Sequence, residues 1–158
     1  MNENIFSHII DQKPGMVDIS HKQSSFRVAC AYARVKIPSV LLVKLTAGPQ
    51  VNNKGPVFDT AILAGTMAVK NTAHLIPLCH PINLTSIKFD ILIENEDIGI
   101  HCEVKTLANT GVEMEALTGV SVAALTIFDM CKSVSSEIVI DTIHVVKKSG
   151  GKHDYEAR

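Results

Sequence analysis

Two stretches of alternating apolar and polar residues, joined by a short polar turn, constrain the fold of this chain most strongly. They read SIKFDILIE at residues 86–94 and GIHCEVKTL at residues 99–107, on either side of NEDIG. Because successive side chains of a strand point to opposite faces, this period of two predicts a β-hairpin. Helical segments are expected before and after the hairpin, and that order fits a ferredoxin-like arrangement.

The remaining elements complete the same arrangement. We expect a strand at residues 26–36 whose Phe26, Val28, Cys30 and Tyr32 parity faces the core, with Arg27 on the other side. The pattern further predicts a short helix after Pro38, a helix that begins at residue 56 and stops at residue 77, a long helix over residues 111–134 and a last strand at residues 137–146. The predicted fold class is therefore α+β: ferredoxin-like, with a mostly antiparallel sheet and helices packed on one face. Residues 1–158 are expected to form one domain, with residues 1–15 as a flexible lead-in and residues 149–158 as a polar tail.

Composition limits the classes of function. Hydrophobic residues make up 46% of the chain and aromatic residues 4%, and the formal net charge is −1. Few aromatic side chains and no excess of positive charge argue against nucleic-acid binding. We find no signal peptide or bilayer-crossing stretch and expect no membrane partner. The four cysteines form no CxxC pair, which favours reduced thiols and a cytoplasmic location.

The stretch LIPLCHPINL at residues 75–84 combines a thiol, an imidazole and two prolines in an apolar setting. A metal site is disfavoured, because Cys79 and His80 are adjacent and no second Cys or His stands at zinc-site spacing. A nucleophilic cysteine is weakly supported, since no base or oxyanion donor is identified. Two alternatives remain: a core histidine, or a rigid loop between Pro77 and Pro81 that presents one imidazole to a ligand.

Acidic and basic side chains stand at both ends of the long predicted helix. Glu113 and Glu115 lie in its first turn, where they favour the positive end of the helix dipole. Asp129 and Lys132 are neighbours three residues apart, and an ion pair is as plausible for them as a catalytic pair. Fourteen residues place Glu115 and Asp129 about 21 Å apart along the axis at ~1.5 Å per residue. One small substrate cannot touch both from the same helix, so this spacing predicts either an extended substrate or an oligomer with shared sites.

Two basic segments are suited to anions without forming a recognised phosphate motif. Lys54 precedes the helix start at Pro56, and KKSGGK at residues 147–152 resembles a phosphate-binding loop. The second segment lacks the Walker spacing and the strand–loop–helix context. Taken singly, an exposed loop lysine and a solvated tail explain both segments.

Taken together and in order, these motifs resemble one family. KGPVFDTAILAG, LIPLCHPI, TGVEMEALTGVSVAALTIFDMCK and KSGGK, with MVDIS near the start, are similar to the cyclic pyranopterin monophosphate synthases, the molybdenum cofactor biosynthesis protein C family. The resemblance spans Met16 to Lys152. It implies conversion of a nucleotide-derived small molecule, 3′,8-cyclo-7,8-dihydroguanosine triphosphate, into cyclic pyranopterin monophosphate and diphosphate. It also implies a homo-hexamer, a trimer of dimers with active sites at subunit interfaces.

The resemblance also implies roles for individual residues. It places substrate contacts at Leu78, Cys79, His80, Met114 and Glu115, catalytic groups at Asp129, Lys132, Lys54 and His80, basic groups at Arg27, Lys105 and Lys148, and Glu113 in an acidic cluster. Lys105 stands where an arginine is common, which removes a planar bidentate contact.

The chemistry of the reaction suits these residue types. The lysines and the arginine would neutralise the triphosphate, and we expect a buried Asp129–Lys132 pair to move protons around the ring. No metal ligand set or cofactor is expected, although Mg²⁺ with the triphosphate stays open. The alternatives are a non-catalytic ferredoxin-like binding module and a metal-dependent purine-nucleotide hydrolase.

Overall fold

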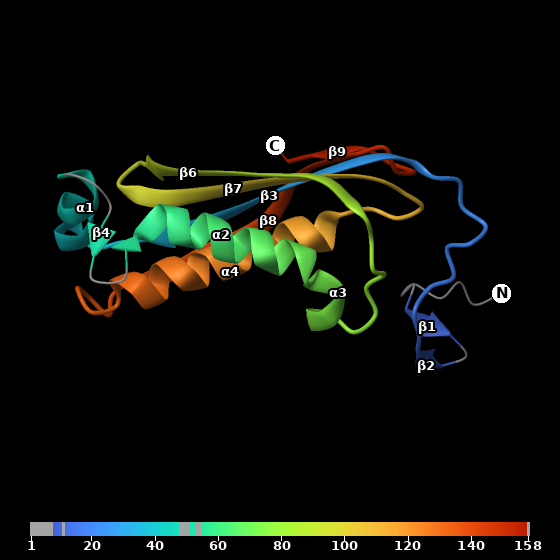
Figure 1. The fold of residues 1–158 in the computed structure, drawn as a ribbon, viewed down its shortest axis with the longest axis horizontal. Helices are drawn as coiled ribbons and strands as arrows, with labels where there is room; N and C mark the ends of the chain where they lie inside the picture. Colours follow the sequence, from blue (N-terminus) through green and yellow to red (C-terminus); the bar gives the residue numbers. More distant parts are fainter. Residues whose placement is uncertain (1–7, 11, 48–50, 53–54, 158) are drawn as a thin grey trace.

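The computed structural model describes residues 8–10, 12–47, 51–52 and 55–157. The elements are β1 (Ile9–Ile10), β2 (Lys13–Pro14), β3 (Ser25–Lys36), α1 (Ser39–Thr46), β4 (Val51–Asn52), β5 (Gly55–Pro56), α2 (Val57–Lys70), α3 (Thr72–Leu75), β6 (Leu84–Glu94), β7 (Asp97–Ala108), α4 (Glu113–Cys131), β8 (Val139–Ser149) and β9 (Tyr155–Glu156) (Figure 1).

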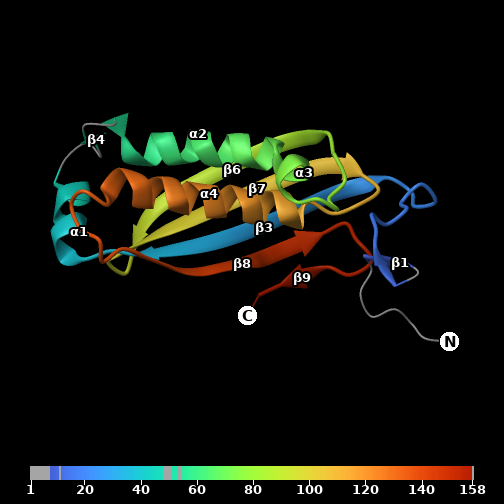
Figure 2. The same cartoon turned by 90° about the horizontal axis from the view of Figure 1, so that it is seen from below.

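Five strands form one antiparallel sheet in the order β6-β7-β3-β8-β9. Helices α2 and α4 pack against one another and cover the same face of this sheet (Figure 2). The β3–α2–β6–β7–α4–β8 connection with β7 and β3 central confirms the predicted ferredoxin-like α+β fold. The predicted hairpin is β6–β7, whose two turn residues Asn95 and Glu96 have φ of 50° and 69°. Positive φ at both turn residues matches the twist of the flanking strands.

The core lies between the sheet and the two long helices. The side chains of β3 that face this core are the alternate set to the one we predicted. Ala29, Ala31 and Ala33 are fully buried, whereas Phe26 is 57% exposed. The small side chains let α4 approach the sheet, so the larger side chains of β3 take the uncovered face. The prediction failed because it assigned the larger apolar side chains, rather than the alanines, to the core.

Close approach of the two long helices depends on glycine. A Cβ on Gly65 of α2 would lie 2.7 Å from Cζ of Phe89 and 3.0 Å from the carbonyl oxygen of Gly119 on α4. The helix predicted to run from residue 56 to residue 77 is interrupted at Asn71, which separates α2 from α3.

The segments at both ends of the chain contain paired strands. β1 and β2 pair within the expected lead-in, and β9 pairs with the edge of β8 within the expected polar tail. The amide of Ala157 also donates to the carbonyl of Val146 at 2.8 Å. Part of the polar tail is therefore held by backbone pairing with the edge strand β8.

Helix α4 is long and apolar enough to cross a membrane by length and composition alone, although we expected no such stretch in this chain. Half of its apolar window is buried inside the fold. It is thus the central core helix of this domain.

Candidate active site

Two cavities flank the first turn of α4. The basic cavity has a volume of about 140 Å³, and residues of β3, β8, the 149–153 turn and the α4 start line it. The loop cavity has a volume of about 210 Å³, and the 78–82 loop, the segment between residues 8 and 22 and the α4 start line it. Gly111 and Glu113 face the first cavity, whereas Thr110, Met114 and Glu115 face the second. The start of α4 is therefore their common wall.

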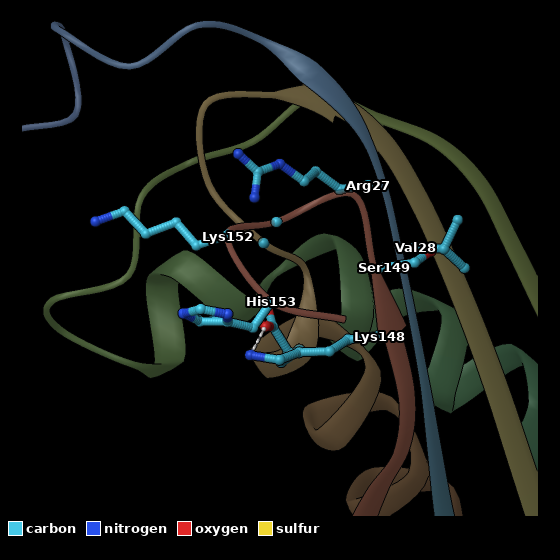
Figure 3. Close-up of a pocket in the computed structure, with 9 residues that line it drawn as sticks. Arg27, Val28, Lys148, Ser149, Lys152 and His153 are labelled. Carbon is cyan, nitrogen blue, oxygen red and sulfur yellow. Dashed lines mark ion pairs between the residues drawn. The ribbon is translucent and has the colours of Figure 1, made fainter. Parts of the chain in front are cut away.

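Basic side chains gather at the basic cavity (Figure 3). Arg27 comes from β3, Lys148 from the end of β8, and Lys152 and His153 from the turn that follows. Lys148 Nζ lies 3.1 Å from Oε1 of Glu113. The Nε atom of Arg27 is buried and has no hydrogen-bond partner among the described residues. This set of donors can neutralise a small polyanion such as a phosphate chain.

The turn that carries Lys152 requires a glycine. Gly150 has a φ of +82°, and a Cβ there would lie 1.9 Å from the carbonyl oxygen of Phe26. Its amide donates to Asp154 Oδ1 at 3.0 Å, and its carbonyl accepts from Ser25 Oγ at 2.8 Å. The KSGGK motif thus bends the chain back over Arg27 and brings its second lysine to the cavity.

The loop cavity contains the thiol and the imidazole that stood out in the sequence. His80 Nε2 lies 2.8 Å from the carbonyl oxygen of Val17, and the buried Thr106 hydroxyl donates to the carbonyl of Asn83 at 2.6 Å. Pro77 and Pro81 restrict the backbone of the intervening loop. The loop is therefore held to the segment at residue 17 and to β7, as expected of the rigid-loop alternative.

Burial changes the ionisation of two groups at the loop cavity. Glu115 is only 4% exposed, and desolvation, reinforced by the charge of Glu113, raises the pKa of its carboxyl. Desolvation, followed by the charge of Glu115, also raises the pKa of the Cys79 thiol. A neutral Cys79 is a weak nucleophile, so the thiol is suited to packing or hydrogen bonding.

The Asp129–Lys132 pair lies at the other end of α4, near α1 and β4 (Figure 1). Lys132 Nζ is 2.7 Å from Asp129 Oδ1, and the two side chains are 55% and 57% exposed. Our expectation of a buried pair is wrong for the single chain, because both residues lie on the side of α4 opposite to the buried Ile127 and Met130. Neither residue lines the two cavities.

One further expected site residue lies outside the described residues, and another lies away from the cavities. Lys54 lies outside the described residues. Lys105 pairs with Glu103 at 2.9 Å and lines neither cavity. Its position on β7 next to the buried Val104 and Thr106 directs it to the uncovered face of the sheet.

Several cavity residues were not expected from the sequence. These are Lys152 and His153 in the basic cavity and His8, Val17, Ile19, Lys22, Ile82 and Thr110 in the loop cavity. The quoted motifs contain Lys152, Val17, Ile19, Ile82 and Thr110, so the sequence held a signal for these residues. The others follow from chain folding, which no local pattern indicated.

Comparison with known proteins gives one consistent result. The model of the MoaC family matches residues 16–151. The chain is 51% identical to a molybdenum cofactor biosynthesis bifunctional protein of Synechocystis over 95% of this chain and 45% of that protein. It is 46% identical to a cyclic pyranopterin monophosphate synthase of Xanthomonas oryzae, over 91% of this chain and 88% of that enzyme. It is 51% identical to a synthase of the same name from Clostridium perfringens, over 87% of each chain.

Proposed function

This chain belongs to the MoaC family and is an enzyme of molybdenum cofactor biosynthesis, a cyclic pyranopterin monophosphate synthase, and we propose that it acts as a phosphorus–oxygen lyase. The proposed substrate is 3′,8-cyclo-7,8-dihydroguanosine triphosphate. In the proposed reaction a sugar hydroxyl oxygen forms a bond to the α-phosphorus, and the bond from that phosphorus to the departing diphosphate breaks. The guanine-derived ring is opened and closed again as a pterin.

The placement of two unlike cavities on one helix start carries this proposal. The basic cavity, with Arg27, Lys148 and Lys152, suits the triphosphate, because charge-assisted contacts would stabilise the negative charge of departing diphosphate. The loop cavity is less charged and suits the heterocycle. One nucleotide that crosses the first turn of α4 would place its phosphates and its ring in the two cavities.

We assign proton transfer around the ring to four residues, His80, Lys132, Lys54 and Asp129. His80 lines the loop cavity and is partly buried, and we assign it the role of a base or a phosphate contact. Lys132 is proposed as general acid and base together with Lys54, and Asp129 as the group that orients Lys132 through their ion pair.

We propose that a second subunit completes the site. Within one chain, Asp129 stands about 21 Å along α4 from Glu115, at ~1.5 Å per residue. Apolar side chains on the outer side of the helix layer, Leu63, Met67 and Leu125, are 67%, 65% and 58% exposed and would be covered in an assembly. A homo-hexamer built as a trimer of dimers, with a shared site at each dimer interface, fits both observations.

The cellular setting and cofactor use are also proposals. All four cysteines are unpaired, which agrees with a reducing cytoplasm. The acid–base and phosphate contacts above need no resident cofactor or protein-bound metal. Turnover that persists in EDTA would support this, and turnover restored only by Mg²⁺ would show that the triphosphate needs the ion.

Product analysis tests the function. The full-length protein is incubated with the cyclised dihydroguanosine triphosphate, and diphosphate and the pterin product are measured. GTP serves as the control substrate. Release of diphosphate from the cyclised substrate but not from GTP supports the synthase, binding without release supports the non-catalytic module, and metal-dependent hydrolysis of GTP supports the nucleotide hydrolase. Retention of single-turnover product formation in Asp129→Asn would contradict the role of Asp129.

A further inference from the structure

The N-terminal arm, residues 16–24, forms one wall of the loop cavity without belonging to any strand or helix. Val17, Ile19 and Lys22 of the arm line the cavity. Internal contacts shape the arm: the amide of Ser20 donates to Asp18 Oδ1 at 2.8 Å, and the amide of Lys22 donates to the carbonyl of Ile19 at 3.1 Å. A segment outside the sheet depends on side-chain contacts to hold its position.

Three such side-chain contacts join the arm to the body of the domain. His80 donates from Nε2 to the carbonyl of Val17 at 2.8 Å. Asn109 donates from Nδ2 to the carbonyl of Ile19 at 3.3 Å, and its Oδ1 accepts a hydrogen bond from the hydroxyl of Ser24. Asn109 thus contacts the arm at two points, from the short connection between β7 and α4.

The contact between His80 and Val17 has a chemical consequence. A backbone carbonyl has no proton to donate, so Nε2 must carry the proton in this hydrogen bond. The neutral ring can then accept a proton only at Nδ1. A displaced arm would release Nε2 and allow the opposite tautomer, with Nδ1 protonated and no longer basic.

We propose that Asn109 is a positioning residue for the reaction: it holds the arm so that the Val17 carbonyl keeps His80 in the Nε2-protonated tautomer. This inference deepens the proposed function, since it presumes that His80 acts on the substrate. Asn109 itself lines neither cavity and touches no reacting atom. Its effect on the reaction passes through the arm and the imidazole.

Other ionisable groups face His80 and must be held constant in the test. Asp18 of the arm interacts electrostatically with His80, and hydrogen bonds from Ser20 lower the pKa of that carboxyl. The other groups at the cavity are His8, Lys22, Cys79 and Glu115. A substitution at Asn109 leaves these residues in the sequence, but a displaced arm would move Asp18 and Lys22 with it.

Three variants and one control separate positioning from stability. Asn109→Asp keeps the size of the side chain and the acceptor for Ser24 but cannot donate to Ile19. Asn109→Ala removes both contacts, and Ser24→Ala removes only the hydrogen bond from the Ser24 hydroxyl to Asn109. Asn71→Ala is the control, because Asn71 also donates from Nδ2 to a backbone carbonyl, that of Met67 at 2.8 Å, but within its own helix and not to the arm.

The primary measurement is the ¹⁵N spectrum of the His80 ring at pH 8 in the full-length protein without substrate. We expect the wild type and Asn71→Ala to show Nε2 protonated, and Asn109→Asp and Asn109→Ala to show a mixture of tautomers. The expected kinetic result is a fall in kcat of about 10-fold with KM changed less than about 2-fold, because a displaced base affects chemistry more than binding. Ser24→Ala is expected to shift both quantities in the same direction by less.

The outcomes distinguish this inference from the proposed function. If every folded variant retains the wild-type His80 tautomer, the inference is overturned, whatever happens to activity. If Asn109→Ala fails to fold, Asn109→Asp and Ser24→Ala still decide the question through the same spectrum. If the wild type shows the expected tautomer but does not turn over the cyclised nucleotide, the proposed function fails and the positioning of His80 stands.

Discussion

A buried carboxyl at the start of α4 links stability to pH. Glu115 is 4% exposed, and desolvation raises its pKa above the ordinary value of 4.5. A raised folded-state pKa means that the contribution of this group to stability is fully present below pH 4.5 and is lost as pH rises through the folded-state pKa. The ionised Glu115 therefore weakens the fold at neutral pH.

We expect Glu115→Gln to raise the thermal unfolding midpoint by about 2–4 °C at pH 8, since a neutral amide avoids the cost of a buried charge. The difference from wild type should vanish near pH 4, where the wild-type carboxyl is also neutral. Thermal unfolding at both pH values measures this. Equal midpoints at pH 8, or a lower midpoint for the variant, would contradict the assignment.

Two adjacent lysines on β8 allow a matched test of the basic cavity. Lys148 lines the cavity and pairs with Glu113 at 3.1 Å, whereas Lys147 points away and pairs with Glu156 at 3.6 Å. We expect Lys148→Ala to lower kcat/KM by about 10- to 100-fold, because a charge-assisted contact to phosphate is lost. Lys147→Ala should change kcat/KM less than about 2-fold. Equal effects of the two substitutions on steady-state kinetics would refute a specific phosphate contact.

At the residue scale, the site was predicted where a motif carried it. Arg27, His80 and Glu115 were named from the sequence, and the structure places all three at the two cavities. Lys22 and Asn109 were missed because their importance depends on where the arm lies, which local sequence does not show. The predicted burial of Asp129 was wrong. Helical spacing shows that Asp129 and Lys132 are neighbours, but it does not show which face of the helix the core covers.

At the element scale, the alternating pattern of the hairpin and the apolar long helix predicted the layers of the fold. Local pattern gave the wrong face for β3 because alanines occupy its core parity. It also missed β9, whose polar sequence pairs only because the edge of β8 is available. Both errors are cases in which tertiary packing overrides local preference.

The crossing of α2 and α4 gives a prediction at this scale. Alanine at Gly65 would place its Cβ 2.7 Å from Phe89 Cζ and 3.0 Å from the backbone oxygen of Gly119. Because a backbone atom cannot move aside cheaply, we expect Gly65→Ala to lower the free energy of unfolding by about 1–3 kcal/mol. Urea unfolding measures the loss, with exposed Lys70→Ala in the same helix as control, expected within ~0.5 kcal/mol of wild type. A Gly65→Ala protein as stable as wild type would show that the helices can separate without cost.

At the scale of the whole molecule, the chain carries two sets of proposed catalytic groups at opposite ends of one helix. The two cavities occupy the start of α4, and the Asp129–Lys132 pair occupies its end (Figure 1). The two ends of the helix stay apart, because α4 is one continuous helix that packs on β3, β7 and β8. A complete site therefore requires two chains if both sets act on one substrate.

Subunit mixing tests this requirement directly. Asp129→Asn and His80→Ala should each be inactive alone, since every site in either assembly lacks one group. In an assembly formed from equal amounts of both variants, a site is intact only when one chain supplies His80 and its neighbour supplies Asp129. Random association makes this true for about a quarter of the sites, so we expect activity to recover to about a quarter of the wild-type value.

The variants are denatured together, refolded and assayed for diphosphate release, with each variant refolded alone as the control. Recovery requires a shared site, because no chain in the mixture carries both groups. A mixture that assembles to the same size as the wild type yet stays inactive would show that each chain uses its own Asp129, or that Asp129 does not act with His80 at all.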